Sequence, residues 1–355
     1  MINQYSEDAI ALLKKLIITQ SFSREEDPTA IILEDWFKSH HIPFERKGHN
    51  LWAFNKYYDE SKPSIVLNSH HDTVRPNKNY TRDPFAATIE DGKLYGLGSN
   101  DAGGCLVGLL HTFLHFYESK DLNYNLIMAA TAEEEISGAG GIASILDQFA
   151  TPEFGIVGEP TLLDLAIAEK GLLVLDIKVK GTSGHAAHIY EDQAMMNTIS
   201  VLEWFRSFEF PKVSEKLGKV KMTVTQINAG SQHNVVPAEV NLTVDIRVTD
   251  AYQNKEVYEI INKAIGSEKV VITPRSFRLN SSGISPEHPF VQAGIAMGKK
   301  TYGSPTLSDQ THMNFPSLKI GPGDSSRSHS ADEFIYINEI EEGINTYISL
   351  LEKIV

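Results

Sequence analysis

NLIMAATAEEE, residues 125–135, decides the fold and raises the question of function. It begins as an apolar run of strand length and ends in three consecutive glutamates. Like charges at neighbouring positions repel one another, and no basic residue nearby in the sequence neutralises them. An apolar run without polar alternation is typical of a strand that is buried on both faces of a parallel sheet. The glutamates therefore stand at the carboxyl end of such a strand, where a cation would explain them.

Three other runs have the same strand character: SIVLN at 64–68, FGIVG at 154–158 and SLKIG at 317–321. An apolar stretch of helical length, about 103–117, separates SIVLN from NLIMAAT. Asp27-Pro28 is a further helix start, with Asp27 as the predicted N-cap and proline at the first helical position. Continuous apolar strands that alternate with helices predict a parallel sheet covered on both faces.

The middle of the chain has a different pattern. LLVLDIKVKG, KVKMTVTQINAG and EVNLTVDIRVT alternate apolar and polar residues, as in an antiparallel sheet with one wet face. With helical stretches near 191–207 and 252–265 and the final run KVVITPRSFRL, the order becomes β-α-β-β-α-β, the ferredoxin-like plan. We therefore predict an α/β fold: a catalytic domain with a mostly parallel sheet, residues 1–171 and 284–355, and an inserted ferredoxin-like α+β domain, residues 172–283.

Composition excludes several classes of protein. The formal net charge of −14 makes a nucleic-acid partner unfavourable. No apolar run reaches the length of about 20 residues that a membrane span needs, and MINQYSEDAI does not resemble a signal peptide. The one cysteine, Cys105, begins an apolar run and is interpreted as a buried thiol. These features predict a cytoplasmic protein without a membrane partner.

Polar residues with metal-binding chemistry follow each apolar strand. The carboxyl ends of parallel strands meet at one edge of a sheet, where sites form. The residues that we expect to converge there are His70, Asp72, Asp101, Glu134, Glu135, Glu159 and His329. Taken singly, each motif has an ordinary explanation. The HxD pattern occurs by chance, a run of glutamates is usually an acidic surface patch, the segment around Glu159 is usually a turn, and His329 alone would be an exposed loop histidine. Their shared position after four strands indicates a site, and imidazole with carboxylate ligands suits Zn²⁺ or another borderline divalent metal.

The ordered series of motifs also resembles a known family. The dizinc aminoacylase and deacetylase metallopeptidases, which include acetylornithine deacetylase, succinyl-diaminopimelate desuccinylase, carboxypeptidases and dipeptidases, carry a similar series over nearly the whole chain, and acetylornithine deacetylase is the most similar in general layout. The motifs are HHDTV (70–74), LYGLGSNDAGG (94–104), TAEEEISG (131–138), VGEPT (157–161), GTSGHAAH (181–188), NVVPAEV (234–240), DIR (245–247) and GPG…SHSADEF (321–334).

The resemblance implies a role for each matched residue. Two Zn²⁺ ions, for which Co²⁺ can substitute, would be held by His70, Asp101, Glu135, Glu159 and His329. Asp101 would bridge the two metals and precede a cis peptide bond. Asp72 would support the imidazole of His70 through its second nitrogen. Glu134 would be the general base, and His185, in the inserted domain, would stabilise the oxyanion from its own or a partner subunit.

The resemblance also implies substrate contacts at Asn234, Arg247 and, more weakly, Ser308. The chain departs from relatives that read GRGxxDMKGG, because it has Leu97, Ala102 and Gly103 there; the metal ligand is kept, but a basic residue near the site is lost. His188 is an extra histidine, open to interpretation as a lid contact or as a surface residue.

The resemblance implies a small N-acyl amino acid as substrate. We expect hydrolysis of an acetyl or a succinyl amide of ornithine or citrulline in arginine biosynthesis, by attack of a hydroxide held between the two metals. Succinyl-diaminopimelate desuccinylase and dipeptidase activity are alternatives within the class. A catalytically silent binding protein is the alternative from another class, although every ligand position and the base are filled. Relatives commonly form homodimers through the inserted domain, and its sheet has edges that need cover.

Overall fold

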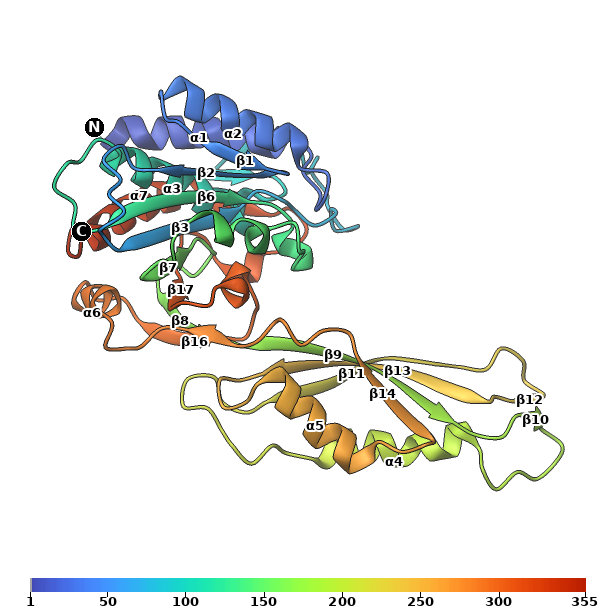
Figure 1. Ribbon diagram of the computed structural model, residues 1–355. Helices are drawn as coiled ribbons and strands as arrows, with labels where there is room; N and C mark the ends of the chain where they lie inside the picture. The colour runs from blue at the N-terminus through green and yellow to red at the C-terminus, as the bar shows by residue number, and fades with distance from the viewer. Residues whose placement is uncertain (1) are drawn as a thin grey trace. The chain divides into compact units, whose positions relative to one another are not determined.

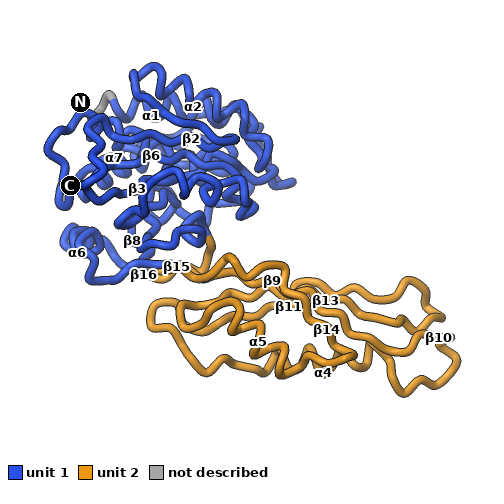
Figure 2. The backbone as a smooth tube through the Cα atoms, viewed as in Figure 1, with its two compact units in different colours: residues 1–167, 283–302, 308–355 blue, residues 168–282, 303–307 orange. Residues whose placement is uncertain are grey.

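The computed structural model describes residues 2–355, with side chains from Tyr5 onward, and divides into two compact units (Figure 2). The first unit takes the chain up to Ile167 together with Gly283–Tyr302 and Ser308–Val355. The second takes Ala168–Ser282 and Gly303–Leu307. The second unit therefore begins a few residues before the predicted insertion, 172–283, and includes a short separate piece of chain.

The sheet of the first unit is parallel at its centre. In the described residues its order is β1-β2-β6-β3-β7-β17-β8-β15, with β16 beside β8 (Figure 1). The pairs β6–β3, β3–β7 and β7–β17 are parallel, whereas β1–β2, β2–β6 and β17–β8 are antiparallel. The strands are β1 Glu45–Lys47, β2 Asn50–Phe54, β3 Ser64–His70, β6 Asn125–Thr131, β7 Phe154–Val157, β8 Leu165–Glu169, β15 Ser282–Gly283, β16 Thr301–Ser304 and β17 Ser317–Lys319.

Both faces of this sheet are covered, which explains the continuous apolar runs. Ile65 and Leu67 of β3 pack into a large core with the helices, whereas Val66 between them faces a second core formed with Ile142 and Phe315. Since successive side chains point to opposite faces, a strand with a core on each side must be apolar at every position. The four runs noted in the sequence are the four adjacent central strands, and the predicted α/β class is confirmed.

Five α-helices are described in the first unit: α1 Ile2–Ile18, α2 Asp27–Ser39, α3 Gly104–Phe116, α6 Pro289–Ala296 and α7 Ile337–Leu351. The prediction for the start of α2 was wrong by one residue, because Glu26 occupies the N-cap and Asp27 is already helical. A small sheet of β4 Thr88–Glu90, β5 Lys93–Tyr95 and β18 Phe334–Tyr336 completes the unit. No helix among residues 2–355 combines the length and apolar character needed to cross a membrane.

The second unit has the ferredoxin-like order of elements. Its four-stranded antiparallel sheet is ordered β11-β13-β9-β14, and its inner face packs with the helices around Ile177 and Val244. Its elements are β9 Gly171–Lys180, α4 Ala194–Ser207, β11 Lys221–Ala229, β13 Glu239–Val248, α5 Asn254–Ile265 and β14 Val270–Pro274. A two-stranded ribbon, β10 Gly184–His185 with β12 Val235–Val236, lies outside this sheet.

Candidate metal centre

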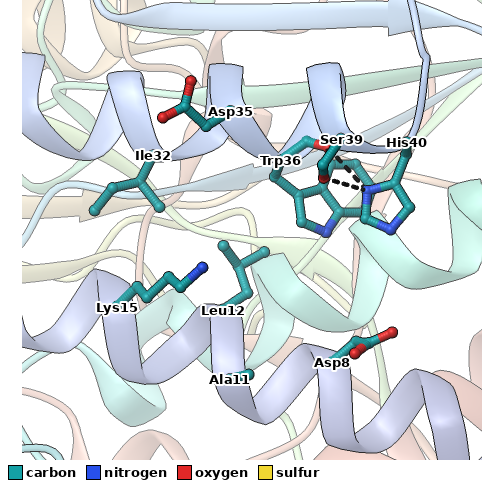
Figure 3. Close-up of a pocket in the computed structure, with 9 residues that line it drawn as sticks. All are labelled: Asp8, Ala11, Leu12, Lys15, Ile32, Asp35, Trp36, Ser39 and His40. Carbon is teal, nitrogen blue, oxygen red and sulfur yellow. Dashed lines mark hydrogen bonds between the residues drawn. The ribbon is translucent and has the colours of Figure 1, made fainter.

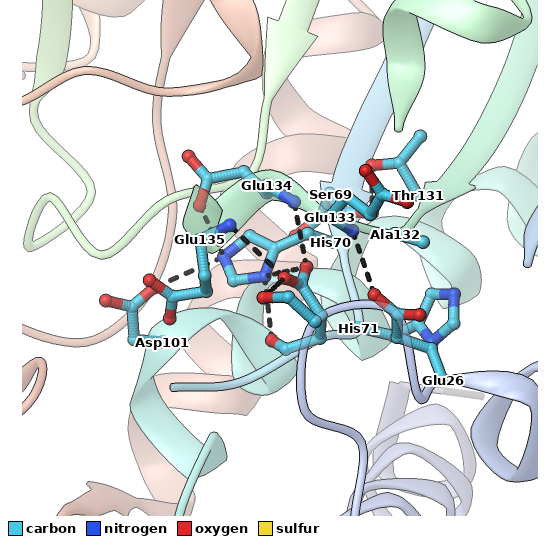
Figure 4. Close-up of polar contacts among 12 residues, drawn as sticks. Glu26, Ser69, His70, His71, Asp101, Thr131, Ala132, Glu133, Glu134 and Glu135 are labelled. Carbon is cyan, nitrogen blue, oxygen red and sulfur yellow. Dashed lines mark hydrogen bonds and ion pairs between the residues drawn. The ribbon is translucent and has the colours of Figure 1, made fainter. Parts of the chain in front are cut away.

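The carboxyl ends of three adjacent parallel strands bring the predicted acidic residues and a histidine together. His70 is the last residue of β3 and pairs in register with Thr131 at the end of β6. Glu134 and Glu135 follow β6 in a short 3₁₀ turn, and Glu159 follows β7. Figure 4 shows His70, Asp101, Glu134 and Glu135 gathered in one place.

Asp101 belongs to two candidate ligand groups at once. His70, Asp101 and Glu159 form one group, and Asp101, Glu135 and His329 form the other; within each, the ligand atoms lie within 4.8 Å of one another. Asp101 Oδ1 lies 3.3 Å from His70 Nε2, and its Oδ2 lies 3.7 Å from His329 Nε2. The two oxygens therefore face different groups. The Asp101–Ala102 peptide bond is cis, as the resemblance implies.

The charge balance of this cluster fits divalent cations. Burial raises the pKa of Glu159 to about 8, and the nearby carboxylate of Asp101 adds to the effect. Burial also raises the pKa of Glu134 and of Glu135. Oxygen Oε1 of Glu159 is buried and has no hydrogen-bond partner. Buried carboxylates without sufficient positive charge are costly, and two divalent cations would supply that charge. Oxygen and imidazole donors in this number suit such ions.

A hydrogen bond and an ion pair at Nδ1, both with Asp72, orient His70 for this purpose. Its Nδ1–H donates to the main-chain oxygen of Asp72 at 3.0 Å, which leaves Nε2 directed at the carboxylates of Asp101 and Glu159. The carboxylate of Asp72, expected to support the imidazole, lies farther from Nδ1, at 3.3 Å. It accepts instead the N–H groups of Glu134 at 3.1 Å and of Glu135 at 3.2 Å. Asp72 therefore fixes both the histidine and the turn that carries the glutamates.

Glu333 is a residue of the centre that sequence reasoning missed. Its carboxylate is 2% exposed and accepts three backbone N–H groups, those of Gly98 at 3.1 Å and of Asn100 and Asp101 at 2.9 Å. It thus anchors the turn that presents Asp101. The only signal in the sequence was its position in SHSADEF, where we selected His329 alone.

The predicted substrate residue Ser308 begins a short turn beside the strand ends of the first unit. Ser308 is buried, and its hydroxyl accepts the N–H of Gln310 at the start of a short 3₁₀ turn. It therefore supports the start of this turn, and its contact with substrate stays a prediction. Its neighbour Asp309 is buried below the strand ends and accepts the hydroxyl of Thr131 at 2.7 Å.

The remaining predicted residues belong to the second unit. His185 lies in the exposed ribbon, where its Nδ1 accepts the N–H of Ala187 at 3.1 Å. Asn234 is exposed, and its main-chain oxygen accepts the N–H of Ala186 at 2.9 Å. Arg247 forms a two-point ion pair with Asp245 on its own strand, with distances of 2.9 and 3.1 Å.

Cavity size alone does not locate this centre. A cavity of about 480 Å³ lies between α1 and α2, far larger than the space of about 20 Å³ beside His70 and Asp101 (Figure 3). None of the residues that line the larger cavity belongs to either ligand group: Asp8, Ala11, Leu12, Lys15, Ile32, Asp35, Trp36, Ser39 and His40. The chemistry of the donors, rather than volume, identifies the site.

Comparison with known proteins agrees with this geometry. The model of peptidase family M20/M25/M40 matches residues 66–353, which include every candidate ligand. The chain belongs to this family. The resemblance noted in the sequence is thereby confirmed, and membership makes the protein a metal-dependent amide hydrolase.

The chain is also similar in sequence to named relatives, and it shares its fold with solved structures. The chain is 27% identical to acetylornithine deacetylase of Edwardsiella ictaluri, over 92% of each chain. It is 28% identical to acetylornithine deacetylase of Proteus mirabilis, over 96% of this chain and 88% of that one. A tripeptidase from Staphylococcus aureus has the same fold, with 19% identity and a TM-score of 0.79 over 98% of each chain. The YXEP protein of Bacillus subtilis, described as a dinuclear metal-binding peptidase, shares it at 14% identity, with a TM-score of 0.73 over 98% of this chain and 97% of that one.

Proposed function

We propose that the protein removes a short acyl group, acetyl or succinyl, from an amino group of ornithine or citrulline, as a cytoplasmic enzyme of arginine biosynthesis. The observation that carries the chemistry is Glu134, a half-buried carboxylate beside both ligand groups that belongs to neither. Its Oε2 lies 3.8 Å from His70 Nε2. A general base for amide hydrolysis must be a carboxylate, or a similar group, that lies beside the metal ligands and is not itself a ligand. The named acetylornithine deacetylase relatives support the choice of substrate.

In this proposal, His70, Asp101 and Glu159 hold one divalent cation, and Asp101, Glu135 and His329 hold the other. Zn²⁺ there, or Co²⁺ in its place, would polarise the amide carbonyl and acidify a water molecule. Glu134 accepts the proton of the attacking water and delivers it to the departing amine. Burial holds the pKa of Glu134 above its ordinary range, which suits a group that must carry a proton between two steps.

His185 would donate to the oxyanion, and its tautomer fits that role. Because Nδ1 accepts the N–H of Ala187, the neutral ring carries its proton on Nε2, and this donor is free to face a ligand. Asn234 and Arg247 would contact the substrate from the same unit, with arginine suited to a carboxylate. In this proposal His185 reaches the centre from its own subunit or from a partner subunit.

We predict that His185→Ala lowers kcat about 10²–10³-fold, the usual effect of losing one oxyanion donor, while cation content stays the same. His188→Ala is the matched control, since its ring lies 5.9 Å from that of His185, and we expect kcat within about threefold of wild type. Steady-state kinetics with metal analysis measures both. Loss of cations from the His185 variant, or unchanged kcat, would contradict the role.

Mixing His185→Ala with Glu134→Ala protein tests the partner arrangement, because mixed dimers regain activity only if His185 acts across subunits.

We also propose a homodimer through the second unit. Met195, Met196 and Ile199 are exposed on α4, and Ile227 is exposed on β11, the edge strand of the sheet that α4 covers. Large exposed apolar side chains beside an open strand edge are typical of a protein interface.

Substituting Ile199→Glu is therefore expected to convert the dimer into a monomer at micromolar concentration, because a charge would be buried in an apolar interface. Sedimentation velocity measures the change. Lys255→Glu, a charge change on exposed α5, serves as the control and leaves the dimer intact. A wild-type monomer, or a dimeric Ile199→Glu variant, would refute this interface.

The substrate is tested by measuring free amine released from N-acetyl and N-succinyl derivatives of ornithine, citrulline and diaminopimelate and from a dipeptide. We expect one ornithine or citrulline derivative to be cleaved far faster than the others. A preference for succinyl-diaminopimelate or for the dipeptide would replace the proposed substrate by that one. Binding of two cations without cleavage of any compound would refute the proposed substrates.

A further inference from the structure

Glu26 is a fully buried carboxylate that lies outside both ligand groups. It occupies the N-cap of α2, and its main-chain oxygen accepts the N–H of Ala30 at 2.9 Å in the usual way. Its side chain does not cap the helix. Instead, Oε1 accepts the N–H groups of Arg24 at 2.7 Å and of Glu133 at 3.1 Å, and Oε2 lies 2.6 Å from His49 Nδ1.

The contact with Glu133 completes a set of three. The successive N–H groups of Glu133, Glu134 and Glu135 are all accepted by buried carboxylates, the first by Glu26 and the other two by Asp72. Figure 4 shows Glu26 beside this glutamate segment. Glu133 has a φ of +55°, in the left-handed region that side chains other than glycine rarely adopt. The chain reverses there as it leaves β6, and the backbone of Glu133 sets the direction of the next two residues.

We propose that Glu26 is a positioning residue that holds the Glu133 reversal, and through it aims Glu134 at the reacting centre. It reaches no ligand atom in either group, so it acts on the base and not directly on the cations. Its position on α2, more than 100 residues earlier in the chain (a separation of 107), ties the reversal to the helical layer. This role rests on the proposed function of Glu134 as the general base.

Two properties of the Glu26 side chain, its length and its charge, can be separated by substitution. Glu26→Gln keeps the length: its amide oxygen can accept the Arg24 and Glu133 N–H groups while its NH₂ donates to a neutral His49. Glu26→Asp keeps the charge but is shorter by one methylene, about 1.5 Å, and cannot reach Glu133 from an unchanged backbone. Glu26→Ala removes both properties. Glu25→Ala is the matched control, because its neighbouring carboxylate is exposed and pairs only loosely with Arg75, at 3.4 Å.

The test combines kinetics, calorimetry with Zn²⁺ and amide hydrogen exchange of the segment 131–138. We expect Glu26→Asp and Glu26→Ala to lower kcat about 10–100-fold, the usual effect of removing an outer supporting partner, with KM and Zn²⁺ stoichiometry unchanged. We expect Glu26→Gln and Glu25→Ala to stay within about threefold of wild type. Exchange in 131–138 should be faster in the Asp and Ala variants only, because the Glu133 N–H is then no longer held.

Each outcome decides the proposal. Wild-type kcat and exchange in Glu26→Asp would overturn it, as would a Gln variant as impaired as the Asp variant, since charge would then matter more than reach. A fall in melting temperature with unchanged kcat would reduce Glu26 to a structural residue. If Glu26→Ala does not fold, comparing kcat and hydrogen exchange between Glu26→Asp and Glu26→Gln still tests the proposal. Hydrogen exchange needs no turnover, so faster exchange in an enzyme that cleaves none of the tested amides would refute the substrate and keep the anchoring role.

Discussion

Glu134→Gln is expected to lower kcat about 10²–10⁴-fold, the range that general base catalysis contributes. Glutamine has the size of glutamate but cannot take a proton from water. Both ligand groups remain complete without Glu134, so two cations should still bind. The turn should also stay in place, because Asp72 holds the backbone N–H of residue 134 and not its side chain. The loss should therefore appear in kcat, with little change in KM.

The neighbouring glutamate provides the matched control for this experiment. Glu133 points away from the ligand groups, and its carboxylate accepts the N–H of Gly140 at 3.2 Å. Glu133→Gln should keep kcat within about threefold of wild type. Equal losses in the two variants would show that acidic charge in general, and not a base at Glu134, supports the reaction. Loss of cations from Glu134→Gln would make Glu134 a ligand instead.

Asp101→Asn is expected to weaken both cation sites, because Asp101 is the one residue shared by the two groups. We expect the affinity at each site to fall at least about 100-fold, beyond the 10–100-fold effect of outer partners. Glu159→Gln and His329→Gln should each weaken only one site. Calorimetric titration of the metal-free protein with Zn²⁺ measures all three variants.

Thermal unfolding gives a second measure of the same sites. A cation at a concentration 100 times its dissociation constant stabilises the native state by about 2.7 kcal/mol. For a domain of this size, that gain corresponds to a rise in melting temperature of about 5–10 °C. A chelator should remove the rise from wild type, and Asp101→Asn should not show it. Asp147→Asn, at an exposed carboxylate that belongs to neither ligand group, should behave as wild type. Two unchanged Zn²⁺ sites in Asp101→Asn would refute the shared ligand.

The central sheet of the first unit could be predicted well from the sequence, because the apolar pattern of each central strand depends only on the residues of that strand. Each central strand is buried on both faces and is therefore apolar at every position. Such a run can be recognised in the sequence without knowing which strand it pairs with. Polar residues directly after such runs, such as His70 and Glu159, then converge because the strands are parallel. The helix stretch before Tyr117 and the ferredoxin-like order could be predicted from the same kind of periodicity.

The supporting residues could not be predicted in this way. Glu333 acts on Asp101 from 232 residues away, and Glu26 acts on Glu133 across 107 residues. Neither stands in a pattern that distinguishes a buried acceptor from an exposed charge. The further contacts of Asp72 with the backbone N–H groups of Glu134 and Glu135 could not be predicted for the same reason, since a side chain selects its partners only after the chain has folded. Edge strands such as β15 are too short to leave a periodic signal.

The order of the ligands along the chain also bears on how the protein matures. His70, Asp101 and Glu159 all precede the second unit, whereas the other group needs His329, which follows it. A polypeptide emerging from the ribosome therefore contains every donor of one site long before it contains those of the other, and domains generally fold as they emerge. The order of synthesis therefore sets the order of assembly: a chain interrupted before His329 carries the complete set of proposed donors for one cation and never for two.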